Sequence, residues 1–409
     1  MAIEELALPL PSEAIRKHMQ YAAWFADERV TRVELRGGEL VVGLGDGADA
    51  AAVAAIRGKL ERLAARFARM DDFEIREVFR TGRAGQAGQA GQAGEPPEVI
   101  EPYDELVARG WVVPLGVGQV ALRGLALELL EFLDDRFVRR VGGPANARPE
   151  YYPGVMATDR LNRTNHFSSF PEHVHFVTHL REDLDVLDQF ARELRDAGGW
   201  TPAILGKLER PMASPVVALN PAVCYHCYAA AENTQLDGDG FVVTARSRCH
   251  RYESGNHRTL ARLLDFTMRE VIYVGRPDFV KAERERGIAL VRALVEDWGL
   301  ATWLETANDP FFTSDFEVKA AFQRQNDMKY ELRMPLPSGS LAAASSNFHS
   351  VTFGKAFNIT SRNRPVCTGC TAFGLERWIY AVFAQCGLDP AAWPAGLRAD
   401  FGRWQASHG

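Results

Sequence analysis

The sequence predicts an α+β fold, in which helices flank a mixed or antiparallel sheet and a small α+β domain precedes it. Strand-like runs outnumber helices between residues 215 and 359, and β-α-β alternations are few. Neither a G-x-G-x-x-G sequence nor a Walker A sequence is present. A low-complexity Ala-Gly-Gln repeat at residues 82–97 separates the two parts and is typical of a flexible linker. The alternative is an expanded surface loop within one domain.

Residues 1–81 are expected to form the small domain, a helix-backed antiparallel sheet of the kind that serves docking or recognition. Gly37-Gly38 lies between two strand-like runs and is a hairpin signal. An Ala-rich stretch with amphipathic spacing predicts the longest helix of this part. The expected elements are helices at residues 12–26 and 48–69 and strands at residues 30–35, 39–44 and 73–79.

Residues 98–409 are expected to form the larger domain. Leu125, Leu129, Phe132 and Phe137 recur on one face of its first predicted helix. The expected helices span residues 122–141, 182–197, 278–298 and 373–386. The expected strands span residues 216–219, 240–244, 246–252 and 271–274.

The composition limits the classes of protein that fit. Hydrophobic residues make up 46% of the 409 residues and charged residues 24%, as in a globular protein with a sizeable core. The net charge of -6 gives no sign of a basic nucleic-acid surface. No apolar stretch approaches the ~20 residues that span a membrane. The first residues lack the basic region of a signal peptide, so we expect a cytoplasmic protein whose cysteines serve as metal ligands or redox thiols.

Cysteines and one carboxylate from three distant segments predict a metal site. The segments are CYHCY at residues 224–228, the stretch from Cys249 to Glu270, and CTGC at residues 367–370. Zinc binds thiolates and carboxylates, and a catalytic zinc keeps one open position beside three protein ligands. We expect Cys224, Glu270 and Cys370 as the ligands, with His226, in a predicted strand, as a weaker candidate.

Two alternatives to the three-ligand site stay open. The two CxxC pairs could form a closed site of four thiolates from Cys224, Cys227, Cys367 and Cys370. Zinc ribbons, however, place their pairs roughly 15–20 residues apart, and here residues 228–366 intervene. The cysteines could also be buried without a metal.

Charged and aromatic residues of the same segments predict a nucleotide site. Arg251 and Glu253 are two residues apart, so on a strand both would project from one face, where they could bind the α-phosphate and the adenine amino group of ATP. Phe266 could stack on the base, and Arg377, which follows Gly374 at a predicted helix start, could hold the γ-phosphate. The alternatives are a solvated surface pair for the first two residues and a core position for Phe266.

These residues carry a resemblance to a known family. HRYE, DFTMRE and G-x-x-x-x-GLERW resemble motifs 2 and 3 of class II aminoacyl-tRNA synthetases over roughly residues 100–400. The sequence most resembles the zinc-dependent seryl-tRNA synthetases of methanogenic archaea and their shortened homologues, the amino acid:[carrier protein] ligases. The resemblance implies an antiparallel class II catalytic domain with zinc held by Cys224, Glu270 and Cys370. It also implies ATP contacts; the residues are Arg251, Glu253, Phe266 and Arg377.

The resemblance implies activation of a small amino acid as an aminoacyl adenylate, with zinc binding its α-amino group and Mg²⁺ accompanying ATP. SSFPEHVHF resembles the carrier-protein ligases, which pass the amino acid to a phosphopantetheine thiol. The C-terminal segment and the N-terminal hairpin resemble the seryl enzymes, so a seryl-tRNA synthetase with a reduced N-terminal domain is the first alternative. A non-catalytic regulatory paralogue is the second. The resemblance also implies a homodimer formed through residues 122–153.

The sequence departs from the family in two features, an additional N-terminal domain and a missing acidic residue. Carrier-protein ligases lack a domain equivalent to residues 1–81, so we expect a docking module whose removal spares adenylate formation. Class II enzymes often carry a metal-binding acid shortly before a Ser-Asn pair, where this sequence has Leu341 in GSLAAASSNFH. Three other residues are expected to line the substrate site, with a structural role as the alternative; they are Glu331, Asn347 and His349.

Overall fold

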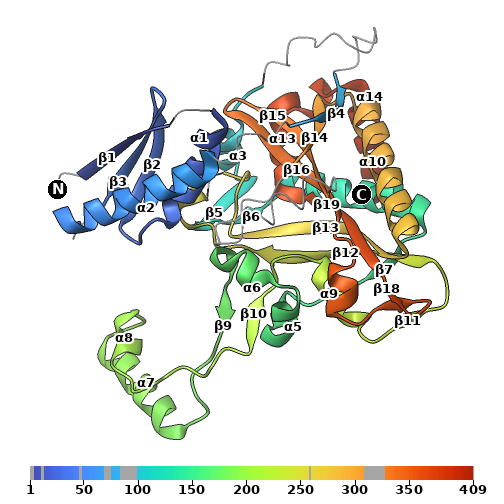
Figure 1. Ribbon diagram of the computed structural model, residues 1–409. Coiled ribbons are helices and arrows are strands. Elements are labelled where there is room, and N and C mark those ends of the chain that lie inside the picture. The colour runs from blue at the N-terminus through green and yellow to red at the C-terminus, as the bar shows by residue number, and fades with distance from the viewer. Residues whose placement is uncertain are drawn as a thin grey trace.

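An eight-stranded sheet runs through the larger part of the molecule, and the predicted α+β fold is confirmed (Figure 1). The structure is a computed structural model that describes residues 4–10, 13–45, 48–68, 75–82, 99–257, 259–307 and 328–408. Neighbouring strands of this sheet pair antiparallel, except that β7 runs parallel to β12. In spatial order the strands are β4 (Glu77–Thr81), β14 (Thr302–Thr306), β15 (Lys329–Leu336), β16 (Gly339–Phe348), β19 (Cys367–Gly374), β13 (Asp265–Gly275), β12 (Gly240–His250) and β7 (Arg148–Glu150).

The alternation of side chains along β13 gives the sheet two buried faces. Val271 and Tyr273 belong to the hydrophobic cluster on one face. Met268, Ile272 and Val274 belong to the cluster on the other face. Glu270 has the same parity as the second set, so its side chain lies on that second face, where a smaller group of helices covers the sheet.

Helices cover the two faces unequally. The first face packs against α4 (Gly124–Phe137), α10 (Pro277–Trp298), α13 (Leu375–Cys386) and α14 (Ala395–His408). The second face packs against α9 (Cys224–Ala230) and α12 (Thr352–Ala356). The long helix α10 has Pro277 at its first position and ends at Gly299, whose φ of 68° suits glycine at a helix end. No helix among the described residues is both long and apolar enough to cross a bilayer.

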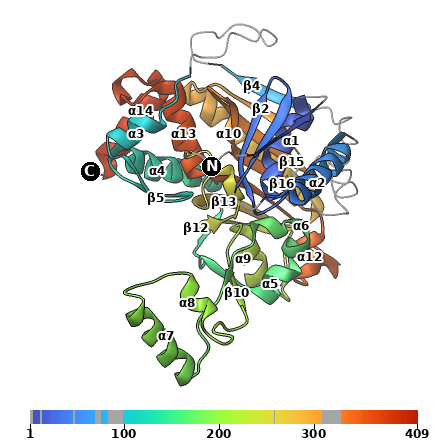
Figure 2. The same ribbon diagram turned by 90° about the vertical axis from the view of Figure 1, so that its left-hand side faces the viewer.

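The N-terminal module, from β1 to α2, is a second layered unit beside the large sheet (Figure 2). Its three strands pair in the order β1-β3-β2, and the turn at Gly37 and Gly38 has φ values of 57° and 95°, which glycine adopts without strain. Ile56 and Leu60 of its long helix are fully buried against this sheet. Its elements are β1 (Glu4–Pro9), α1 (Glu13–Ala22), η1 (Ala23–Phe25), β2 (Val30–Arg36), β3 (Glu39–Leu44) and α2 (Ala50–Ala68).

The strand expected at residues 73–79 does not belong to this module. Residues 77–81 form β4, which pairs with β14 at the edge of the large sheet. Phe79 is buried in the first-face cluster, and Thr81 Oγ1 lies 2.9 Å from Thr302 Oγ1. The assignment of this strand to the N-terminal sheet is therefore wrong, because its hydrophobic partner lies in the large domain. Apart from Gly82, the expected linker lies outside the described residues.

Two short helices form an arm. Both views show α7 (Leu184–Asp196) and α8 (Ala203–Gly206) projecting away from the body (Figures 1 and 2). The strands expected at 240–244 and 246–252 form one strand, β12. The remaining elements are α3 (Tyr103–Ala108), β5 (Val112–Gly116), β6 (Gln119–Leu122), η2 (Val138–Gly142), η3 (Gly143–Ala145), β8 (Val155–Ala157), α5 (Thr158–Arg163), α6 (His166–Ser169), η4 (Pro171–His173), β9 (Phe176–Val177), β10 (Val217–Leu219), β11 (Gln235–Leu236), η5 (Ser254–Asn256), β17 (Thr360–Ser361), β18 (Arg364–Pro365) and η6 (Pro390–Ala392).

Candidate metal centre and nucleotide site

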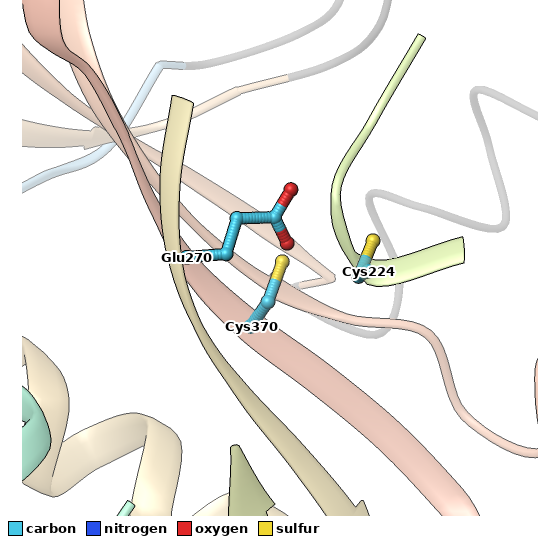
Figure 3. A group of neighbouring side chains, drawn as sticks. All are labelled: Cys224, Glu270 and Cys370. Atoms are coloured by element: carbon cyan, nitrogen blue, oxygen red, sulfur yellow. The ribbon is translucent and has the colours of Figure 1, made fainter. Parts of the chain in front are cut away.

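Two thiols and one carboxylate meet on the second face of the sheet. One potential ligand atom from each of Cys224, Glu270 and Cys370 lies within 4.8 Å of the other two, and all three residues are buried (Figure 3). The side chains point toward one another from a helix start and two strands. This set of three is the potential metal-ligand group found among the described residues.

Strand register brings the group together. Strands β13 and β19 are antiparallel neighbours in which Glu270 pairs with Ala372 and Cys370 pairs with Ile272. The two side chains are therefore diagonal neighbours on one face. Cys224 is the first residue of α9, which packs over that face. The strand expected at CYHCY is wrong: the segment is a helix, and its first turn carries the thiol toward the sheet.

The surroundings of the group fit a cation. Glu270 accepts a hydrogen bond from the Val223 N–H at 3.2 Å through Oε1, whereas its buried Oε2 has no partner. Burial raises the pKa of Glu270. A hydrogen bond with Cys370, together with burial, raises the pKa of Cys224 well above its usual value. An oxygen without a partner beside two thiols is a donor set that suits zinc. Thiols and carboxyls bind a metal only after they lose their protons, so zinc binding here would release protons.

The closed four-cysteine arrangement does not form. Cys367 and Cys370 are three residues apart on β19, so they point to opposite faces, and Cys367 packs in the first-face cluster. Cys227 interacts with Tyr152, and neither it nor His226 joins the group of potential ligands. Because Cys367 and Cys370 lie on opposite faces of the strand, they cannot bind one ion together, so the structure agrees with the long separation of the two pairs in disfavouring the four-thiolate site.

Arg251 and Phe266 lie together at the end of the β12–β13 pair. The guanidinium carbon of Arg251 lies 5.6 Å from the centre of the Phe266 ring, and its Nε donates to the Pro221 carbonyl at 3.1 Å. The expectation that Arg251 and Glu253 share a strand face is wrong, because β12 ends at His250. The chain then turns, and Ser254 adopts a left-handed φ of 50°.

A basic cluster surrounds the residues that are expected to bind the nucleotide. Arg377 lies in the first turn of α13, as predicted, and donates to the carbonyl oxygens of Ala261 at 2.8 Å and Ala342 at 3.1 Å. Burial, with Arg262 and Arg251 nearby, lowers the pKa of Arg377 to about 10. The buried Glu253 forms an ion pair with Arg262, which the sequence analysis missed. Among these three guanidiniums, that of Arg262 is paired with Glu253, whereas those of Arg251 and Arg377 donate to backbone carbonyls, so an anionic ligand would be favourable beside them.

The two halves of the site are joined by one short segment. The Pro221 carbonyl accepts from Arg251, and the Val223 N–H donates to Glu270. Cys224 follows directly in the chain and belongs to the group of potential metal ligands. Residues 221–224 therefore fix the distance between the basic cluster and the Cys–Glu–Cys group.

The three expected lining residues occupy different places. Asn347 donates to Cys370 Sγ at 3.4 Å, so it lies directly beside the metal-ligand group. His349 Nδ1 lies 3.3 Å from the Tyr228 hydroxyl and 3.2 Å from Thr368 Oγ1, within the aromatic packing behind that group. Glu331 pairs with Lys329 at 3.1 Å and Arg333 at 3.0 Å. Glu331 also contributes to the electrostatics of Arg377.

Comparison with solved structures shows that the fold is that of class II synthetases. The fold matches M. kandleri SerRS, solved in complex with A. aeolicus tRNASec, with a TM-score of 0.69 over 98% of this chain and 78% of that chain at 19% identity. The chain belongs to the amino acid–[acyl-carrier-protein] ligase family. It is 34% identical over 252 residues to amino acid–[acyl-carrier-protein] ligase 1 of Bradyrhizobium diazoefficiens, covering 60% of this chain and 74% of the relative.

A second group of relatives is more distant. The chain is 27% identical over 302 residues to the type-2 serine–tRNA ligase of Methanothermobacter thermautotrophicus. The matched region covers 72% of this chain but only 58% of the relative. A scan against models of protein families finds no match. Both groups of relatives are ligases, and this chain is an enzyme of the same class II synthetase-like kind.

Proposed function

We propose that this protein activates a small amino acid with ATP as an aminoacyl adenylate and transfers it to the phosphopantetheine thiol of a carrier protein. The observation that carries the proposal is the buried Cys–Glu–Cys group fixed next to a cluster of three arginines. Membership in the family of amino acid–[acyl-carrier-protein] ligases supports the choice of acceptor.

In this proposal Cys224, Glu270 and Cys370 hold zinc, whose chemistry when bound is that of a Lewis acid able to take the α-amino group of the substrate. Arg251 neutralises the charge that develops on the α-phosphate when the substrate carboxylate attacks it. Arg377 stabilises the departing pyrophosphate. No protein nucleophile is required, since the carboxylate of the amino acid is the attacking group. The remaining residues act by positioning the reactants.

The adenine is placed by two further residues. Phe266 supplies a ring for stacking, and Glu253 supplies a buried carboxylate for the exocyclic amino group. Mg²⁺ arrives with the triphosphate in this proposal, because ion pairs with Lys329 and Arg333 occupy the Glu331 carboxylate. The adenylate is then attacked by an external thiol, and AMP leaves as the thioester forms. A thiol of ordinary pKa is ionised enough near neutrality to act without a strong base.

Two further parts of the proposal concern assembly and location. A homodimer formed through residues 122–153 is supported by the edge position of β7 in the sheet and by Tyr151, whose side chain is 91% exposed beside it. A cytoplasmic location is supported by five buried cysteines that form no disulfide within the part of the chain that the structure describes; they are Cys224, Cys227, Cys249, Cys367 and Cys370.

The proposal is tested by amino-acid-dependent exchange of pyrophosphate into ATP across a panel of amino acids, with zinc quantified in the same preparation. We expect exchange with one small amino acid and one zinc per chain. Transfer assays with a phosphopantetheinylated carrier protein and with tRNA then identify the acceptor. Zinc-loaded protein without exchange for any amino acid would instead support a regulatory paralogue.

A seryl-tRNA synthetase with a reduced N-terminal domain is the second candidate. The similarity to type-2 serine–tRNA ligases over 302 residues favours it. In this case serine alone would support exchange, and aminoacylation of tRNA would fall steeply with salt. Loading of a carrier protein with no tRNA charging would exclude this candidate.

Replacing Asn347 by alanine should weaken zinc binding by about 10- to 100-fold, the usual cost of losing an outer-shell partner of a metal ligand. The reason is its hydrogen bond to Cys370 Sγ, which orients the thiolate. The measurement is competition with a chelator of known affinity. Gln189→Ala, which removes an exposed bond to the Lys207 carbonyl in the arm, is the control and should bind zinc normally. Equal affinity in the two variants would contradict the prediction.

A further inference from the structure

The N-terminal module contacts the large domain at the loop between β12 and β13, residues 251–264. The Asn256 side-chain amide donates to the Tyr21 carbonyl at 3.1 Å, and Ser254 Oγ donates to the Trp24 carbonyl at 3.4 Å. These bonds join the end of α1 and the turn η1 to the short helix η5. The β12–β13 loop is the same segment that carries Glu253 and precedes Phe266.

Gly255 permits the close approach of the two parts. A Cβ atom built at Gly255 would lie 2.1 Å from the nearest atom of the Trp24 ring, a separation that real structures do not show. The indole of Trp24 therefore rests on the backbone of the loop. Any larger side chain at this position would push the module and the loop apart.

Tyr21 extends from the module to the charged residues of the nucleotide site. The guanidinium carbon of Arg262 lies 4.7 Å from the centre of the Tyr21 ring, and Arg262 forms the ion pair with Glu253. The Tyr21 hydroxyl lies 3.4 Å from His173 Nε2. Burial and the nearby Glu253 raise the pKa of Tyr21, so the phenol keeps its proton. One aromatic ring of the module thus touches the loop and faces η4.

The conformation of the loop also determines the position of Arg377. The Ala261 carbonyl, which directly precedes Arg262 in the chain, accepts a hydrogen bond from Arg377 Nε at 2.8 Å. A single segment therefore sets the positions of Glu253, Arg262 and Arg377. Loops of this length commonly open locally at low free-energy cost unless other parts hold them.

We infer that the N-terminal module completes the nucleotide site, because Tyr21 and Trp24 hold the β12–β13 loop in the conformation that binds ATP. Tyr21 and Trp24 are positioning residues that act through Arg262 and Gly255. The inference rests on the proposed function, since it names ATP as the ligand. It replaces the expectation that the module only docks a partner and can be removed without affecting adenylate formation.

The inference predicts a selective effect of Tyr21→Ala in the full-length protein. We expect the KM for ATP in pyrophosphate exchange to rise about tenfold, the loss of a desolvated cation–π contact. The KM for the amino acid should stay within about twofold, because the contacts that Tyr21 and Trp24 make with the large domain at Asn256, Ser254 and Arg262 are on the β12–β13 loop and not on the Cys–Glu–Cys group. Tyr21→Phe keeps the ring over Arg262 and should restore most of the ATP affinity.

A second variant approaches the contact from the loop. Gly255→Ala should raise the KM for ATP in the same direction, because its Cβ displaces Trp24. Gly402→Ala is the matched control, since a Cβ at that helical position meets no atom within 4 Å. Amide hydrogen exchange gives a readout that does not need catalysis: exchange at residues 251–264 should accelerate in Tyr21→Ala and Gly255→Ala and stay unchanged in Gly402→Ala.

The outcomes separate the inference from the proposed function. Unchanged ATP KM and unchanged loop protection in Tyr21→Ala would overturn the inference. A parallel loss of affinity for ATP and amino acid, without rescue by Tyr21→Phe, would also overturn it, since this pattern indicates general destabilisation. If the wild type shows no exchange with any amino acid, the proposed function fails, and ATP-induced thermal stabilisation of the wild type and Tyr21→Ala then decides the inference alone.

Discussion

Replacing Cys370 by alanine should abolish both zinc binding and amino-acid activation. The thiol is one of three potential ligands gathered within 4.8 Å, so the remaining pair, Cys224 and Glu270, would leave the ion undercoordinated. We expect a loss of affinity beyond the roughly 100-fold that follows from losing an outer-shell partner. Zinc content after dialysis and pyrophosphate exchange are the two measurements, and both should fall to background.

Cys367→Ala is the control for this experiment. It changes the same residue type on the same strand, but its side chain lies on the opposite face of the sheet. We expect full zinc content and exchange, with a small loss of thermal stability from the lost packing. If Cys370→Ala retains zinc, or if Cys367→Ala loses it, the three-ligand centre is refuted. Circular dichroism of both variants verifies that the fold is intact.

Replacing Arg251 by alanine should lower the rate of exchange by about 10²- to 10³-fold, the usual cost of removing one preorganised donor that stabilises transition-state charge. Its guanidinium is held next to Phe266 by the hydrogen bond to the Pro221 carbonyl. The effect should appear in kcat more than in the KM for the amino acid, because the charge on the α-phosphate develops during the reaction.

Arg276→Ala controls for the loss of an arginine that directly follows one of the two strands β12 and β13. Arg276 follows β13 at the far end and forms an ion pair with the exposed Asp239. Such exposed pairs contribute little, so exchange should be unchanged. Equal activity of Arg251→Ala and wild type would show that the arginine is structural, and the assignment of the α-phosphate position would have to move to Arg262 or Arg377.

The sequence predicted the parts of the fold with long periodic patterns. The expected helix at residues 278–298 is α10 at Pro277–Trp298, because both a proline start and a glycine end mark its boundaries. The short CYHCY segment was misassigned, since a run of five apolar and aromatic residues has no period that distinguishes helix from strand. Strand β4 was assigned to the wrong sheet because its partner lies more than 200 residues away in the chain.

The residues of the candidate site were also predictable only in part. Cys224, Glu270 and Cys370 could be singled out from residue type and from the resemblance, and the structure gathers them in one group. Arg262 and Tyr21 could not be singled out, because their importance comes from a contact between two domains that no local pattern encodes. The parity of residues along β19 would have separated Cys367 from Cys370, had the strand been recognised.

The edge strand β4 changes what connects the two domains. It pairs with β14 through Thr81 and Phe79, while the N-terminal module that precedes it rests on the β12–β13 loop. The module is therefore fastened to the large domain at two places, neither of which depends on the peptide chain after residue 82. A break of the backbone between residues 83 and 98 would leave a two-fragment enzyme held by a sheet edge and an aromatic contact, and fragments cut there should assemble when expressed as separate polypeptides.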